Sequence, residues 1–255
     1  MSRTLENKVA LITGAGQGIG QGIAFSLASR GVRVIAVGRT LDKCERTAQE
    51  IKRRFDQDAA ALQCDISDLS ALDELITEAH ALFGRLDILV NNAVSTTVKP
   101  LLNVDVSEFE AGLRVGPVAT LRLMQLAYPH LKAHSDGCII NLASTAAMRW
   151  DASNYGVYAA EKEAIRALTR AAACEWGPDG IRTNVILPHA KSPALAAWAQ
   201  HRPEEAAAFE QSIPLRRIGE CEEDIGEFVA LLCSAESRYV NGQSIAVDGG
   251  QANLG

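Results

Sequence analysis

Residues 13–20 read TGAGQGIG, directly after the apolar run VALIT of residues 9–13 and directly before a helical pattern over residues 18–29. The glycines follow a Gly-x3-Gly-x-Gly spacing and not GxGxxG, because Ile19 stands where the third glycine of that pattern would fall. Such a turn brings the backbone close to a pyrophosphate and points a helix N-terminus at its negative charge. It therefore predicts a dinucleotide-binding turn, with an ordinary glycine-rich turn as the alternative. The residues expected to contact the dinucleotide here are Gly14, Gln17, Gly18, Ile19 and Gly20.

Short apolar runs alternate with longer helical patterns along the whole chain. The runs are nearly continuous in apolar character, which is typical of parallel strands buried on both faces. We therefore expect a single doubly wound, Rossmann-type α/β domain over residues 1–255, with a central parallel sheet of about seven strands and helices on both faces. The expected strands are 9–13, 32–37, 60–64, 88–91, 137–143, 182–187 and 244–247. The expected helices lie near 18–29, 41–55, 68–83, 106–134, 153–176 and 222–234.

The least regular part of the chain is the segment 188–218, which contains four prolines and two short alanine-rich patches. Long irregular excursions in compact domains are more often functional loops than linkers. We therefore expect this segment to be a substrate loop or lid.

Composition and charge exclude several classes of protein. Apolar residues make up 47% of the 255 residues and charged residues 22%, which argues against wholesale disorder. The net charge of −6 argues against a nucleic-acid partner, which would call for a basic surface. Apolar runs are too short to cross a membrane, and the polar start of the sequence leads directly into a strand, so we expect a cytoplasmic protein. The histidine pair His130 and His134 has no acidic or thiol ligand nearby in sequence, and no metal site is expected.

The end of the second expected strand indicates which nucleotide is bound. An acidic residue there would accept the ribose 2′-hydroxyl of NAD. This chain has Arg39 and no carboxylate, and a guanidinium can pair with the 2′-phosphate of NADP. The position favours NADP(H) over NAD(H), with a solvated loop arginine as the alternative. Asp65, followed by Ile66, stands just past the third strand, where its carboxylate can accept from the adenine amino group or cap the next helix.

Polar and small residues follow the later strands at the points where each one ends. The triplet Asn91-Asn92-Ala93 follows the fourth strand, Ser144 the fifth and Pro188 the sixth. In a parallel sheet these positions share the carboxyl edge with the glycine-rich turn. We therefore expect them to line one crevice.

Tyr158 and Lys162 stand four residues apart and so share one face of a helix. A phenol with its usual pKa near 10 is a poor acid–base catalyst at neutral pH. The lysine ammonium and an oxidised nicotinamide would both favour the phenolate and lower that pKa. Ser144 can donate to the same substrate oxygen. Tyr155 is the rival tyrosine, but the residue four further on is Ala159, which cannot tune it.

With these motifs the sequence resembles the short-chain dehydrogenase/reductase family over essentially its whole length. The matching features also include Ile213-Pro214-Leu215 and the tail from Val240 to Gly250. The resemblance implies hydride exchange between a nicotinamide and a ketone or secondary alcohol. It implies that Tyr158 is the general acid–base, that Lys162 holds the nicotinamide ribose and that Ser144 orients the substrate. Homodimers or homotetramers packed through the two long helices, near 106–134 and 153–176, would be usual.

The chain departs from the family pattern at several positions. Val94 stands where the family usually has glycine, and His189 follows Pro188 where a second glycine is usual. The family's threonine contact to the carboxamide corresponds to Ser192. Gly116 stands where the family usually has an asparagine that holds a proton-relay water, so the relay is put in doubt while the Ser–Tyr–Lys set is intact.

Substrate identity is not encoded in a motif. Bulky side chains near the expected crevice suggest a partly apolar or aromatic small molecule, although each can equally belong to the core. A non-catalytic dinucleotide-binding regulator on the same scaffold is the alternative function, and the three intact catalytic residues argue against it. The family-like dehalogenases lack the nucleotide glycines and the lysine, which this chain retains. The candidate substrate-binding residues are Val94, Trp150, Tyr155, His189 and Trp198.

Overall fold

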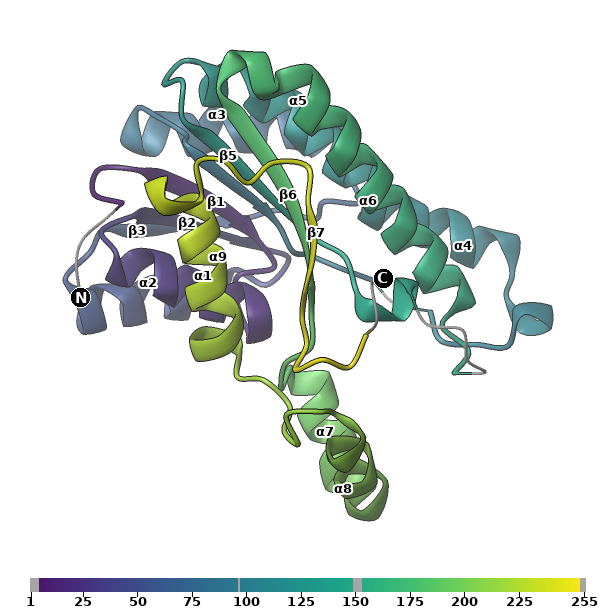
Figure 1. Ribbon diagram of the computed structural model, residues 1–255. Coiled ribbons are helices and arrows are strands. Elements are labelled where there is room, and N and C mark those ends of the chain that lie inside the picture. The colour runs from purple at the N-terminus through teal and green to yellow at the C-terminus, as the bar shows by residue number, and fades with distance from the viewer. Residues whose placement is uncertain (1–4, 96, 149–152, 253–255) are drawn as a thin grey trace.

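Seven parallel strands form one sheet in the order β3-β2-β1-β4-β5-β6-β7 (Figure 1). They belong to a computed structural model that describes residues 5–95, 97–148 and 153–252. The order reverses between β1 and β4, so the chain winds outward in both directions from the centre, as expected for a doubly wound domain. The strands are β1 (Val9–Thr13), β2 (Arg33–Gly38), β3 (Ala59–Gln63), β4 (Ile88–Asn91), β5 (Gly137–Leu142), β6 (Ile181–Pro188) and β7 (Ser244–Val247).

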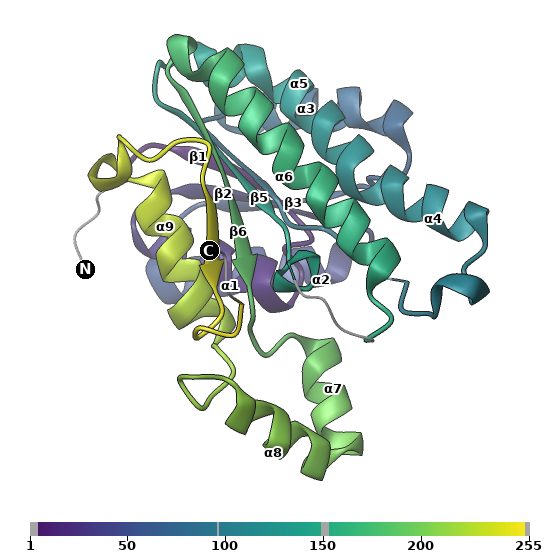
Figure 2. The same ribbon diagram turned by 45° about the vertical axis from the view of Figure 1, so that its right-hand side comes forward.

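Helices cover both faces of this sheet (Figures 1 and 2). Between the strands also lie short 3₁₀ turns at Leu69–Ala71, Leu101–Asn103, Thr145–Ala147, Gly177–Asp179 and Ala235–Ser237. The α-helices are α1 (Gly18–Ser29), α2 (Leu41–Phe55), α3 (Leu72–Phe83), α4 (Val106–Leu113), α5 (Ala119–Lys132), α6 (Gly156–Trp176), α7 (Pro193–His201), α8 (Pro203–Ser212) and α9 (Glu227–Cys233).

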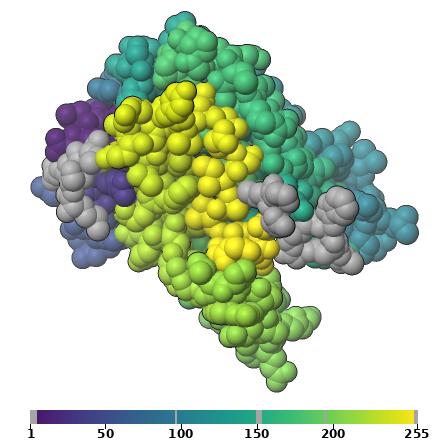
Figure 3. Space-filling model, in the orientation of Figure 1, coloured from purple at the N-terminus to yellow at the C-terminus, as the bar shows by residue number. Residues whose placement is uncertain are grey.

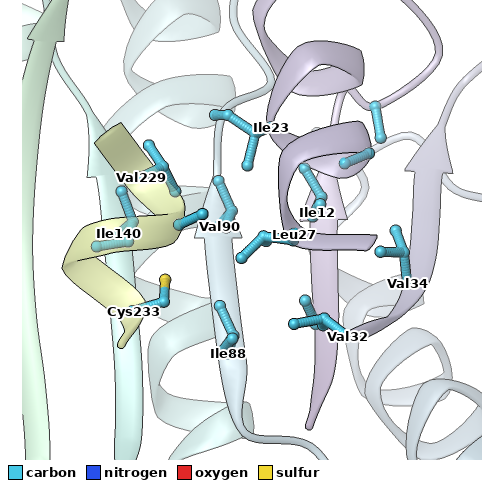
Figure 4. Packing of buried hydrophobic residues seen from close by; sticks show 14 of the residues in the cluster. Ile12, Ile23, Leu27, Val32, Val34, Ile88, Val90, Ile140, Val229 and Cys233 are labelled. Atoms are coloured by element: carbon cyan, nitrogen blue, oxygen red, sulfur yellow. The ribbon is translucent and has the colours of Figure 1, made fainter. Parts of the chain in front are cut away.

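Successive residues of the central strands pack into two different cores. Ile12 of β1 packs with Ile23 of α1 and Val229 of α9 on one face (Figure 4). Leu11, the preceding residue of the same strand, packs with Leu75 and Leu123 of the helices on the other face. Side chains alternate across a strand, so a strand buried on both faces must be apolar throughout. This packing confirms the single Rossmann-type domain predicted from the sequence.

Two of the expected helices are not continuous. The stretch 106–134 is split into α4 and α5 by a π-helical segment, Arg114–Val118, and Pro117 lies inside it. Proline lacks an N–H and clashes with the preceding turn, so it distorts a helix at this point. The stretch 222–234 likewise begins as a π-helix, Cys221–Gly226, before α9. Strand ends differ from the expected ones by a residue or so.

The irregular segment 188–218 contains α7 and α8, which project from the body of the molecule beyond the carboxyl edge of the sheet (Figures 1 and 3). Its role as a lid stays a prediction. No helix in the part of the chain that the structure describes is long and apolar enough to cross a bilayer.

Candidate active site

The glycine-rich turn joins β1 to α1 in a conformation that only glycine adopts easily. Gly14 and Gly18 have φ values of +66° and +58°. Gly20 is required for a different reason, because a Cβ atom there would lie 2.5 Å from both Gly14 O and Asn92 Nδ2. Among the described residues, no side chain caps the N-terminus of α1. The first N–H groups of that helix are therefore available to an anion such as a pyrophosphate.

Asn92 fastens this turn to the neighbouring strand. Its Nδ2 donates to Thr13 O at 2.8 Å and to Gly14 O at 3.2 Å. The Thr13 hydroxyl accepts from the backbone N–H groups of Asn92 and Ala93, each at 3.0 Å. The asparagine amide therefore shapes the glycine turn and has no N–H left for a ligand.

A cleft of about 430 Å³ opens at the carboxyl edge of β1, β2 and β4. Its volume and position suit part of a dinucleotide at the topological switch point. Gly20, Pro188 and the Ser144–Tyr158–Lys162 set lie outside its lining, so the cleft accounts for the nucleotide half of the expected site only. The residues predicted to bind the cofactor that do line it are Gly14, Gln17, Gly18, Ile19, Arg39, Asp65, Ile66, Asn92, Ala93 and Ser192.

Two cationic side chains stand where the cleft meets the end of β2. Arg39 is exposed, and Lys43, one helical turn further on, lines the same cleft and donates to Gln17 Oε1 at 2.7 Å. Lys43 was not among the predicted cofactor-binding residues. Its position four residues after Arg39 could have indicated a second cation for the same phosphate. Asp65 does not cap a helix: its Oδ1 accepts from Ser67 N at 2.9 Å in a local turn.

The helix-cap alternative for Asp65 is wrong, because the cap after β3 is Asp68. The Asp68 side chain accepts from Ser70 N at the start of the short turn that leads into α3. Asp65 itself lines the cleft.

Ser144, Tyr158 and Lys162 come together beside β5. Ser144 lies two residues after the end of this strand, and its hydroxyl accepts from Ala146 N at 3.1 Å. Tyr158 and Lys162 lie one turn apart on α6, with the Lys162 ammonium 5.5 Å from the centre of the phenol ring. The ammonium donates to Leu142 O at 2.8 Å, at the end of β5. These contacts fix the lysine against both the strand and the tyrosine.

Burial dominates the electrostatics of this group. It raises the pKa of Tyr158 to about 12, and a hydrogen bond with Ser144 acts in the opposite direction. Burial also lowers the pKa of Lys162 to about 8, and the charge of Glu161 opposes that shift. The sequence-based expectation that the lysine lowers the phenol pKa is therefore not met by the protein's own residues. Low polarity disfavours both the phenolate and the ammonium.

The candidate substrate residues divide into two groups. Val94 lines the cleft, and the ring of Tyr155 lies edge-on to that of Tyr158, with centroids 5.8 Å apart. His189 and Trp198 meet instead through Phe209 of α8, which contacts both rings edge-on. His189 also borders a separate cavity of about 690 Å³ beside β7. Trp150 lies outside the described residues.

Fold and cleft together define a Rossmann-type protein with a dinucleotide site at the edge of its sheet. A family model described as enoyl-(acyl carrier protein) reductase matches residues 14–252. The chain is 34% identical over 252 residues to a 12α-hydroxysteroid dehydrogenase from Clostridium sp., covering 96% of each chain.

Solved structures agree with this match. A protein from Beutenbergia cavernae assigned as an NAD(P)-dependent gluconate 5-dehydrogenase, with bound NADP, aligns with a TM-score of 0.90 at 34% identity, covering 98% of this chain and 99% of that one. A 3-ketoacyl-(acyl-carrier-protein) reductase from Brucella melitensis, complexed with NADH, gives 0.88 at 33% identity, covering 98% of this chain and 100% of that one. The chain belongs to the short-chain dehydrogenase/reductase family, a family of oxidoreductases.

Proposed function

We propose that the protein is an NADP(H)-dependent oxidoreductase that interconverts a ketone and a secondary alcohol, with Tyr158 as the general acid–base. The observation that carries this proposal is the grouping of Ser144, Tyr158 and Lys162 at the carboxyl edge of the sheet that also holds the glycine-rich turn. A protein that only bound a nucleotide would have no use for a phenol and a hydroxyl grouped beside a buried ammonium.

Each residue has a separate task in this mechanism. The nicotinamide, when bound, supplies or accepts the hydride. The Tyr158 hydroxyl donates its proton to the carbonyl oxygen during reduction and takes it back during oxidation. Ser144 donates a hydrogen bond to the same oxygen. The Lys162 ammonium, 5.5 Å from the centre of the phenol ring, would hold the nicotinamide ribose next to Tyr158.

The residues around the cleft fit a dinucleotide. The uncapped N-terminus of α1 and the turn of Gly14 and Gly18 would hold the pyrophosphate. Asp65 would accept from the adenine amino group. Pro188 and Ser192 would lie towards the carboxamide, since Pro188 ends β6 and Ser192 follows it at the same edge of the sheet.

NADP(H) is preferred because cations and no carboxylate stand at the end of β2. Arg39 and Lys43 would pair with the 2′-phosphate, whereas residues 38–41 offer no carboxylate to accept the 2′-hydroxyl of NAD. The similar structures contain NADP in one case and NADH in another. The preference therefore depends on this chain's own residues.

Arg39→Ala should weaken NADPH binding by roughly 30-fold, the equivalent of about 2 kcal/mol for a lost charge-assisted contact. The Kd for NADH should change little. Both constants can be measured by titration calorimetry. Arg46→Ala on the exposed side of α2 is the matched control, because Arg46 lies outside the cleft and donates to Asp42 O. A wild type that binds NADH more tightly than NADPH would contradict the assignment.

The activity itself is tested by following the nicotinamide absorbance while NADPH is offered with a panel of ketones. Turnover supports the enzyme, whereas tight NADPH binding with no turnover of any carbonyl would favour the non-catalytic regulator. The panel should emphasise partly apolar and aromatic ketones, because the ring of Tyr155 lies against that of Tyr158 and the aromatic side chains of Trp198 and Phe209 stand on α7 and α8. Thermal stabilisation in the presence of NADP would extend the screen to further ligands. In this proposal the helices α7 and α8 close over the substrate as a lid.

We also propose a cytoplasmic homodimer or homotetramer. Large apolar side chains are exposed along the α4 and α5 side of the molecule, among them Leu102 at 99%, Val106 at 74% and Val118 at 41%. Large apolar side chains exposed on one side of a protein can form an association surface. Light scattering of the purified protein should give a multiple of the monomer mass, and Val106→Glu should shift the mass towards the monomer. A wild type that stays monomeric at micromolar concentration would contradict this part of the proposal.

A further inference from the structure

Glu161, between Tyr158 and Lys162 on α6, is the most unusual side chain near the site. It is only 1% exposed, and its Oε1 has no hydrogen-bond partner among the described residues. Removing a carboxylate from water without compensation costs several kcal/mol. A residue of this type in a core position therefore calls for a reason other than packing.

The space for this carboxylate is created by Gly112 on the adjacent helix α4. A Cβ atom at Gly112 of α4 would overlap Glu161 Oε1, so any larger residue would displace the acid. Gly116, in the π-helical segment, is the second neighbour, and a Cβ atom there would lie 3.7 Å from Glu161 Cβ and 3.9 Å from Oε2. Figure 2 shows α6 running alongside α4, so the carboxylate is enclosed between the two helices.

Lys162 is the charged group that acts on the Glu161 carboxylate among the described residues. On α6 itself, the titratable neighbours are Lys162 and Tyr158. From α4 and the π-helical segment, Gly112 and Gly116 lie against Glu161. Charged residues of these two segments have other partners: Glu108 pairs with Lys99, and Arg114 donates to Ser67 O. Glu161 and Lys162 are adjacent on α6 and both are buried, so their opposite charges act on each other across a region of low polarity.

We propose that Glu161 is a positioning residue that acts through Lys162, holding its buried side chain in the ammonium form needed beside Tyr158. This inference deepens the proposed function and rests on it. Without the carboxylate, the lysine would lie against a backbone carbonyl and an aromatic ring with no negative charge to offset its burial.

The direction of the electrostatic effect follows from the two shifts already described. Burial lowers the pKa of Lys162 to about 8, and Glu161 opposes that fall. Glu161 also contributes to the raised pKa of Tyr158. Neutralising Glu161 should therefore lower the pKa of Lys162 and the pKa of Tyr158. The ammonium and the phenol would each lose a proton at a lower pH than in the wild type.

Glu161→Gln tests this without a change of volume. In protein labelled with ¹³C-lysine, the Lys162 ¹³Cε resonance should titrate about one pH unit lower in the variant, the shift expected for one charge several ångströms away at an effective dielectric constant near 20. The chain has only seven lysines, so Lys162→Met assigns the resonance. The alkaline limb of the kcat/KM profile for NADPH-dependent reduction should move to lower pH by a similar amount.

Glu163→Gln is the matched control. Glu163 lies on the same helix, is 43% exposed and pairs with Arg166, so its loss should leave both profiles unchanged. An unchanged Lys162 midpoint in folded Glu161→Gln would overturn the inference. The Lys162 titration does not require turnover. A protein that reduces no carbonyl would refute the proposed function, but the titration would still test the role of Glu161.

The wild type and a pair of glycine variants provide further readouts should Glu161→Gln fail to fold. In the wild type, the Lys162 resonance should show a second, smaller inflection where Glu161 gains its proton, and its absence would contradict the pairing. Gly112→Ala should displace the carboxylate and lower the Lys162 midpoint, whereas Gly116→Ala adds only an ordinary contact and should leave it in place. Equal midpoints in these two variants would also count against the inference.

Discussion

Tyr158→Phe should reduce kcat for ketone reduction by a factor on the order of 10²–10⁴ while the Kd for NADPH stays nearly the same. The variant loses the one proton that the mechanism places at the carbonyl oxygen, and positioned general acids contribute about that much to rate. The ring itself is kept, so its edge-on contact with Tyr155 and its neighbourhood with the Lys162 ammonium remain. Steady-state rates and NADPH titration on the same preparation measure both effects.

Tyr155→Phe is the natural control for this substitution. Tyr155 is 37% exposed, precedes α6 and touches the ring of Tyr158, but it has no lysine one turn further on. Its hydroxyl should be dispensable for the chemical step, so kcat should stay within a few-fold of the wild type. Activity near wild type in Tyr158→Phe, or a comparable loss in both variants, would remove Tyr158 from the role assigned to it.

The fold was predictable because its strands are buried on both faces. Ile12 and Leu11 pack into opposite cores, so the strand had to be apolar at every position and could be recognised from a short run of letters. The turn after it was equally clear, since Gly14 and Gly18 occupy left-handed backbone conformations that favour glycine. Local sequence and long-range packing require the same residues here.

The π-helical segment is a feature that the local sequence does not predict. Gly116 and Pro117 indicated a distorted helix, but the sequence does not show whether the chain kinks, breaks or takes an extra residue into one turn. The outcome depends on what packs against the segment, and that neighbour is α6 with Glu161, some 45 residues away in the sequence. Such contacts leave no periodic signal.

The site was predictable where chemistry demands a fixed residue type, and much less so where packing decides. Tyr158 with Lys162 could be found from their spacing taken together with the glycine-rich turn and Ser144. Asn92 was placed correctly at the cleft, but its amide is used up in holding the glycine turn. The contact of Phe209 with His189 and Trp198 depends on how α8 folds back on α7. No sequence motif predicts that arrangement. Buried charge at Glu161 is likewise visible only in three dimensions.

Lys162→Met should abolish most turnover and at the same time stabilise the fold at neutral pH. The side chain is only 3% exposed, and its pKa is lowered from the usual 10.5 to about 8, so folding at pH 7 requires burying an ammonium. A shift of that size corresponds to roughly 3 kcal/mol of destabilisation, an upper bound for a buried group. Methionine fills a similar volume with an apolar chain. It leaves Leu142 O without its partner, at a cost of about 1–2 kcal/mol.

The stability difference between Lys162→Met and the wild type should change with pH in a direction set by the lowered pKa of Lys162. Below pH 8 both the folded and the unfolded lysine are charged, so the wild type carries the whole burial cost. Between pH 8 and 10.5 the folded protein binds fewer protons than the unfolded chain, and wild-type stability rises relative to the variant. The advantage of Lys162→Met, measured by urea unfolding, should therefore be greatest near neutral pH and shrink as the pH approaches 10.5. A variant that is less stable than the wild type at pH 7, or a stability difference that does not change with pH, would show that the ammonium is not buried at a cost. The lysine would then be an ordinary structural contact, and the case for a tuned Tyr158–Lys162 pair would lose its energetic basis.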